Sequence, residues 1–184
     1  MTLYSNKKGQ FGIILFFIIL FTILIAGFAG VMIVSVLDYA SDEITPIMEG
    51  IGMVGDSNIS EYSDYTFGTV DTLVSAAPWL LALMYGLALV FSIVFAVGYS
   101  YNPHPVFIGF YIAFMILLIF GAIIISNMYQ DIYSGTDEIA TRLQEQTMMS
   151  YMLLYSPFIL SLIAVIAGIF LFARTSADAG GFEV

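Results

Sequence analysis

The sequence contains no cysteine, one histidine and only four Lys and Arg residues. The absence of cysteine excludes disulfide bonds, thiolate metal sites and a cysteine nucleophile. Four basic residues are too few to form a surface that neutralises phosphates, so nucleic acid is not expected as a partner. Charged residues make up 10% of the chain, whereas they make up about 25% of an average soluble domain. These shortages argue against a soluble globular domain.

The sequence is instead rich in apolar residues. Hydrophobic residues are 60% of the 184 positions, compared with roughly 45–50% in a soluble domain. Disorder requires low hydrophobicity and is therefore excluded. The apolar runs are hydrophobic on every face and do not alternate in polarity as barrel strands would. The composition therefore predicts an integral membrane protein that spans the bilayer with helices, which satisfy their own backbone groups.

Charged residues are missing from three long stretches: between the N-terminal lysines and Asp38, between Asp71 and Asp131, and between Glu145 and the C-terminal arginine. His104 is the only ionisable residue inside them. A membrane-spanning helix needs about 20 apolar residues, so the outer stretches hold one span each. The middle stretch holds two, because two prolines flank His104 and form a turn. The predicted spans are 11–37, 78–98, 106–129 and 151–173.

The distribution of basic residues predicts the orientation of these spans. Lys7 and Lys8 precede the first span and Arg174 follows the fourth. Because basic residues accumulate on the cytoplasmic side, both termini are expected to be cytoplasmic. The longer loops, 38–77 and 130–150, then face outward and contain 12 of the 14 acidic residues.

The two halves of the chain resemble each other. Asp42-Glu43 follows the first span and Asp137-Glu138 follows the third, while Pro78 and Pro157 begin the returning spans. This pattern predicts a parallel repeat, with chance similarity between apolar helices as the alternative. The predicted fold class is an all-α membrane protein with four transmembrane helices in two tandem helical hairpins. Its segments are a cytoplasmic N-terminus (1–10), a first hairpin (11–98) with an acidic outer loop (38–77), a cytoplasmic turn (99–105), a second hairpin (106–173) with an outer loop (130–150), and a flexible cytoplasmic tail (174–184).

The first outer loop contains an apolar stripe. Ile44, Ile47, Met48 and Ile51 recur at the spacing of one helical face. A short amphipathic helix that lies on the outer leaflet or on the bundle is therefore expected, and its stripe is the predicted partner-contact surface. Glycines end this helix, and a mobile polar loop is expected at 56–65.

The second outer loop predicts a helix that starts at about Asp137 and continues towards the fourth span. Glu138 and Arg142 are four residues apart in this helix and are expected to form an ion pair. Asn58, in the first loop, opens an Asn-Ile-Ser triplet that fits an N-glycosylation acceptor, although such triplets also arise by chance.

No catalytic, cofactor-binding or metal-binding site is predicted. The spans contain no charged residue, which argues against a proton relay. Four polar residues in the spans either line a polar path or bond to helix carbonyls, and the second interpretation is favoured. The acidic loop residues either bind Ca²⁺ or Mg²⁺ or form a solvated acidic face, which is again the favoured interpretation. The four polar residues are Ser92, Ser126, Asn127 and Ser161, and the acids are Asp38, Asp42, Glu43, Glu49, Asp131, Asp137 and Glu138.

The N-terminus carries a resemblance. Lys7-Lys8-Gly9-Gln10-Phe11, followed by an apolar helix, resembles the archaeal class III (prepilin-type) signal and the start of many small uncharacterised archaeal membrane proteins. The sequence departs from the bacterial form of this signal, which has an acid where Ile14 stands. The short hydrophobic hairpins with a Pro-aromatic return also resemble those of archaeal spindle-shaped virus coat proteins. The resemblance implies an archaeal or archaeal-virus origin.

The sequence thus favours a non-enzymatic structural or assembly subunit of a membrane complex or virion membrane. Its expected partners are the lipid bilayer and other membrane subunits or further copies of the chain. The alternative is a small channel or transporter subunit, which would require a continuous polar path through the spans.

Overall fold

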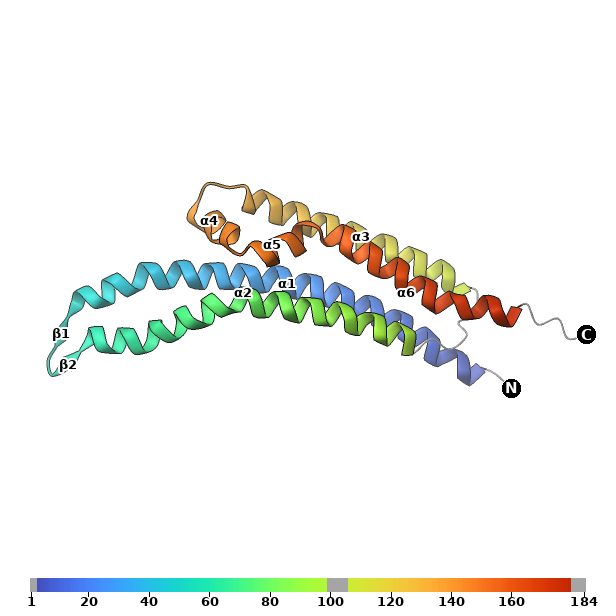
Figure 1. The fold of residues 1–184 in the computed structure, drawn as a ribbon, viewed down its shortest axis with the longest axis horizontal. Coiled ribbons are helices and arrows are strands. Elements are labelled where there is room, and N and C mark those ends of the chain that lie inside the picture. The colour runs from blue at the N-terminus through green and yellow to red at the C-terminus, as the bar shows by residue number, and fades with distance from the viewer. Residues whose placement is uncertain (1–2, 99–105, 180–184) are drawn as a thin grey trace, which may run out of the picture.

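The computed structural model describes residues 3–98 and 106–179, with side chains over 11–96 and 106–172. Helices dominate the architecture (Figure 1). The elements are α1 (Leu3–Ile51), β1 (Met53–Val54), β2 (Ser57–Asn58), α2 (Ile59–Gly98), α3 (Val106–Tyr133), α4 (Glu138–Glu145), α5 (Thr147–Leu154) and α6 (Ser156–Ala179).

The helices α1 and α2 run antiparallel, side by side, along the long axis of the molecule (Figure 1). They contain 49 and 40 residues and are joined by β1 and β2, which pair through Met53–Asn58 and Val54–Ser57. Gly52 and Gly55 have φ values of 67° and 63°. Only glycine adopts this left-handed region at no steric cost, so these two residues allow α1 to end and the chain to reverse.

The predicted end of the first span at residue 37 is wrong as a helix boundary. The helix α1 continues to Ile51, so the expected separate helix over the apolar stripe is the last part of α1. The mobile loop expected at 56–65 is also wrong, because α2 already begins at Ile59. The polar residues that follow the apolar run are compatible with a helix, so α1 continues beyond Asp38. Pro46 also lies inside α1, where it is exposed. The first backbone position that cannot continue the helix is Gly52.

The second half packs against one side of α1. The helices α3 and α6 lie next to each other, and the short helices α4 and α5 connect them (Figure 1). The helix expected from Asp137 is confirmed: α4 begins at Glu138, and the Asp137 carboxylate accepts a 2.9 Å hydrogen bond from the Ala140 N–H. The predicted fourth span is not one straight helix, because α5 and α6 meet at a bend of 64° around Tyr155.

Three helical segments in the described part of the chain are long and apolar enough to cross a membrane, and the number becomes four if the bent pair of α5 and α6 is one span. The three are Phe11–Ile51, Ile59–Ala96 and Val106–Tyr133. The all-α class and the presence of apolar helices of membrane-spanning length are therefore confirmed. Pro78 lies inside α2, whereas Pro157 is the second residue of α6, so the two prolines have different local settings.

The core lies where α1 meets the other helices. Phe17 packs against Tyr111 of α3 with ring centroids 5.1 Å apart, and Tyr111 packs against Phe172 of α6 at 5.3 Å. The Tyr111 hydroxyl donates a hydrogen bond to the Ala164 carbonyl of α6. Such aromatic pairs contribute about 0.5–1.5 kcal/mol each beyond the burial of their surface. This part of the interior is therefore apolar, and its buried hydroxyl has a partner.

Candidate functional site

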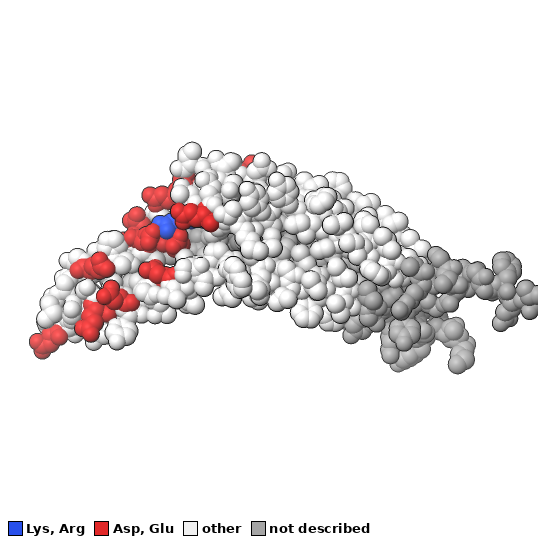
Figure 2. All heavy atoms as spheres, viewed as in Figure 1, with Lys and Arg blue, Asp and Glu red and all other residues white. Residues whose placement is uncertain are grey.

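One end of the molecule is strongly acidic. We call residues 38–77 the acidic arm; it comprises the end of α1, both strands and the start of α2. Its outer part projects beyond the α3–α6 side of the molecule (Figure 1), and acidic side chains gather over this end (Figure 2). The arm contains eight acidic residues and no Lys or Arg: Asp38, Asp42, Glu43, Glu49, Asp56, Glu61, Asp64 and Asp71.

The inner seam of the acidic arm contains buried hydroxyl side chains. Ser41 of α1 and Ser63 of α2 are buried, and the Ser41 hydroxyl donates a 2.6 Å hydrogen bond to Asp71 Oδ1. The hydroxyls of Thr45 and Ser63 are also buried and have no hydrogen-bond partner within the described chain. Apolar side chains of the arm are half-buried as well, among them Met48, Phe67 and Val70.

The outer surface of the acidic arm is apolar in several places. Ile47 is 64% exposed, and Ile44 and Ile51 are exposed on the same face of α1. Met48 of the predicted stripe is half-buried. The arm thus exposes apolar side chains beside its carboxylates, although an amphipathic helix usually turns its apolar residues towards its neighbours. Other exposed apolar residues of the arm are Met53, Val54, Tyr62, Tyr65 and Leu73.

An ion-pair cluster joins the base of the acidic arm to α4. Arg142 Nη1 lies 2.6 Å from Asp38 Oδ2, and Nη2 bonds to the Asp42 carboxylate. Hydrogen bonds with Asp42 and Asp38 raise the pKa of Arg142 above its ordinary value, so the guanidinium stays charged. The predicted Glu138–Arg142 pair is wrong: among the described residues, both ion pairs of Arg142 are with α1. One planar guanidinium that donates to two carboxylates is favoured over a single surface pair along one helix.

A polar cavity of about 330 Å³ lies beside this ion-pair cluster. Its acidic lining comprises Asp38, Asp42, Asp71 and Glu145, against the single base Arg142. Gln146 also lines it; this side chain is 6% exposed, and its Nε2 donates a 2.7 Å hydrogen bond to Ser35 Oγ. Within the part of the chain that the structure describes, no group of three or more acidic or histidine side chains is placed to hold a metal ion. The four carboxylates around the cavity outnumber its single guanidinium, so the electrostatic field at the base of the arm is negative.

The polar residues predicted in the spans do not converge on one path. Asn127 is exposed on α3. The three serines satisfy their hydroxyls on main-chain carbonyls, as the favoured interpretation expected. Ser92 donates to the Leu89 carbonyl (2.7 Å), Ser126 to the Leu154 carbonyl (2.7 Å) and Ser161 to the Phe158 carbonyl (2.8 Å).

The remaining predicted positions are distributed as follows. Asn58 is exposed in β2 at the tip of the acidic arm, so its glycosylation stays a prediction. His104 lies outside the described residues, as do the side chains of Lys7 and Lys8. Asp131 lies in the last turn of α3, Asp137 caps α4 and Glu138 is the first residue of α4.

Comparison of the chain with protein-family models, with curated proteins and with solved structures finds no match. The archaeal resemblance of the N-terminus therefore stays an expectation. Function is argued from the geometry of the chain alone.

Proposed function

We propose that the chain is a non-enzymatic assembly subunit of a membrane complex, and that the acidic arm docks a partner protein. In this proposal the chain crosses the bilayer four times as two helical hairpins. Both termini face the cytoplasm or virion interior, and the arm faces outward. The observation that carries the proposal is the exposure of three isoleucines of the arm, Ile44, Ile47 and Ile51, among its carboxylates.

Lipid is a poor explanation for the exposed isoleucines of the acidic arm. Asp42, Glu43 and Glu49 lie on the same helical stretch as Ile47, and charged side chains are costly within a hydrocarbon environment. The arm therefore belongs to the aqueous side of the membrane. Apolar patches on an aqueous surface, rimmed by polar residues, are typical of protein interaction sites. The stripe Ile44, Ile47, Met48 and Ile51 supports such a contact.

The charge of the acidic arm favours a basic partner over a second copy of the chain. Eight carboxylates without a Lys or Arg make two arms repel each other. A partner with Lys and Arg residues around an apolar patch complements both features of the arm. Screening by salt should weaken the approach of such a partner. The alternative function, a channel or transporter subunit, has less support, because the serines of the spans are bonded to carbonyls.

The experiment that tests this function compares two double variants in the native membrane. Ile47→Ser with Met48→Ser removes the apolar contact, and Ile47→Leu with Met48→Leu is the matched control that keeps it. After extraction in mild detergent, the wild type and the leucine control should migrate in a complex larger than the single chain. The serine variant should leave that complex and remain in the membrane. Equal migration of the two variants, or a wild type that migrates as a single chain, would contradict the proposal.

A further inference from the structure

One face of α3 carries a row of exposed side chains at a regular spacing. The helix packs against α1, α4, α5 and α6 (Figure 1), and its buried residues lie on the other side. Successive residues of the exposed row are alternately four and three positions apart, which is the spacing along the contact between two helices of a left-handed coiled coil. We call this row the α3 face. Its apolar part comprises Gly109, Ala113, Ile116, Phe120 and Ile123.

Two amide side chains continue the α3 face. Asn127 and Gln130 occupy the next two positions of the row, and both are exposed. Neither side chain has a hydrogen-bond partner within the part of the chain that the structure describes. The neighbouring Ser126 is buried and differs, because its hydroxyl donates a 2.7 Å hydrogen bond to the Leu154 carbonyl. The polar group that points into the bundle is therefore paired, whereas the two on the α3 face are not.

Contacts with α1 place these amides beside an apolar stretch. The ring of Tyr129 packs against Phe28 with ring centroids 6.4 Å apart, and Phe28 lies within the uncharged stretch of α1 that ends at Asp38. Asn127 precedes Asp131, the only charged residue of α3, by one helical turn. The helix is long and apolar enough to cross a membrane. Because an amide in hydrocarbon is stabilised by hydrogen bonds from a neighbouring helix, a polar group of a second helix is expected here.

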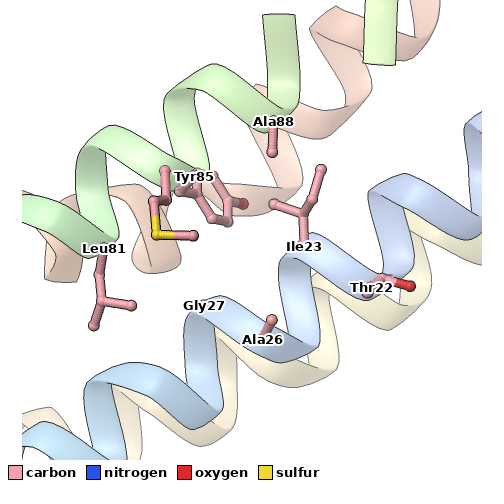
Figure 3. Close-up of a pocket in the computed structure, with 8 residues that line it drawn as sticks. Thr22, Ile23, Ala26, Gly27, Leu81, Tyr85 and Ala88 are labelled. Atoms are coloured by element: carbon pink, nitrogen blue, oxygen red, sulfur yellow. The ribbon is translucent and has the colours of Figure 1, made fainter. Parts of the chain in front are cut away.

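The groove between α1 and α2 makes no comparable demand on a partner. It contains a cavity of about 220 Å³ lined mainly by apolar side chains such as Ala26 and Leu81 (Figure 3). The Tyr85 hydroxyl is buried and therefore not accessible from this cavity. The other hydroxyl of the lining belongs to Thr22, and a threonine can bond to a carbonyl of its own helix. An amide has two donors and an acceptor to satisfy, so the α3 face selects its partner more strongly.

We propose that two copies of the chain associate in the membrane through the α3 face, with the two α3 helices parallel. Copies inserted in the same direction place equivalent positions opposite each other about a two-fold axis. Because an amide both donates and accepts, Asn127 pairs with the same residue of the second copy, and Gln130 does likewise. A Cβ atom at Gly109 would meet nothing within 4 Å, so this end of the face lets the helices approach closely. The acidic arm belongs to other elements and takes no part in this contact.

Asp131 opposes this association. It follows Gln130 directly and is exposed, so the pairing of two copies brings two carboxylates near each other at the end of α3. Replacing the charge with an amide in Asp131→Asn removes this repulsion. The substitution should therefore strengthen the association of the two copies.

The test uses the full chain, purified and reconstituted in phosphatidylcholine liposomes at several protein-to-lipid ratios. Since the chain has no cysteine, Phe120→Cys supplies one thiol on the α3 face for oxidative cross-linking. Ile169→Cys on α6 is the matched control, because Phe120 and Ile169 are both 62% exposed. Asn127→Leu, Asn127→Gln and Asp131→Asn are each compared in the Phe120→Cys chain. Asn127 and Asp131 are exposed, so these substitutions leave the interior unchanged.

Phe120→Cys should give a covalent dimer whose yield rises with the protein-to-lipid ratio and saturates, and Ile169→Cys should give much less. Asn127→Leu should weaken the association about 3- to 10-fold, the equivalent of one hydrogen bond between helices. Asn127→Gln keeps an amide and should weaken it less, and Asp131→Asn should strengthen it. Equal dimer yields from positions 120 and 169, undiminished association in Asn127→Leu, or weaker association in Asp131→Asn would overturn the proposal. The outcome is separate from the docking function proposed for the acidic arm, because the arm is unchanged and no partner protein is present.

Discussion

Arg142 and Asp38 form a 2.6 Å contact although 104 positions separate them in the sequence. The contact joins α4 to α1 at the base of the acidic arm. Asp42 lies one helical turn after Asp38, so both carboxylates reach the same planar guanidinium. This cluster connects the two halves of the chain on the side from which the arm projects.

The first prediction concerns the strength of this connection. Arg142→Met should lower the free energy of unfolding by on the order of 1 kcal/mol, because the partly exposed pairs are weakened by solvent. Unfolding in detergent micelles, followed by circular dichroism, measures the change. Glu138→Gln is the matched control and should have little effect, because Glu138 has no ion pair with Arg142 in the described structure. If Glu138→Gln lowered the free energy of unfolding more than Arg142→Met, the result would contradict this prediction and favour the Glu138–Arg142 pair.

The pH dependence of the same cluster gives a second prediction. Hydrogen bonds with Asp42 and Asp38 raise the pKa of Arg142 in the folded state, so its stabilising effect is complete below the unfolded-state pKa and is lost as pH rises through the higher folded-state pKa. The wild type should therefore keep this contribution at alkaline pH. A lysine has an ordinary pKa of about 10.4, so the contribution of the side chain in Arg142→Lys should decrease above that range. The difference in Tm between the two proteins should widen from pH 8 towards pH 11. A constant difference would contradict this prediction.

A buried hydroxyl relay between α3 and α5 gives a third prediction. The Ser150 hydroxyl donates a 2.7 Å hydrogen bond to the Leu143 carbonyl. The Tyr129 hydroxyl lies 2.5 Å from the Ser150 hydroxyl oxygen. Ser150→Ala leaves both the carbonyl and the tyrosine hydroxyl without this partner, at a cost of about 1–3 kcal/mol for each buried group. Tyr129→Phe leaves the Ser150–Leu143 bond intact. Thermal unfolding should therefore show a larger loss for Ser150→Ala, and the reverse order would contradict the relay.

The proposed orientation gives a fourth prediction, for which the absence of native cysteine is convenient. Ser57→Cys in the acidic arm and Gln144→Cys in α4 should react with a membrane-impermeant thiol reagent in intact cells. Ser5→Cys should react only after the membrane is permeabilised. The opposite pattern would reverse the orientation.

The hydropathy of the sequence predicts the apolar helices because each run must satisfy its backbone inside lipid. The end of α1 was not predictable from hydropathy. The residues after Asp38 are less apolar than those before it, but they are compatible with a helix, and the helix ends only where Gly52 has a positive φ. Loss of apolar character marks the end of a membrane-spanning stretch and does not mark the end of a helix.

The candidate site was predictable in part. The stripe that includes Ile44 and Ile47 is visible as a spacing of three and four residues, and both residues are exposed. The partners of Arg142 were not predictable, because a local pair with Glu138 is the only signal that the sequence offers. The Tyr85 hydroxyl is buried without a hydrogen-bond partner among the described residues, and the sequence gives no signal of this, because it depends on tertiary packing.

We propose that the acidic arm contacts a basic partner protein through its exposed isoleucines. Photo-cross-linking in the native membrane tests it most directly, with a photoreactive side chain at position 47 and, as the control, at the exposed position 18 of the apolar stretch of α1. We predict that position 47 cross-links to a different protein through a segment rich in Lys and Arg, that the yield decreases at high salt, and that position 18 gives no such product. Cross-links from position 47 only to lipid or to another copy of this chain would contradict the claim.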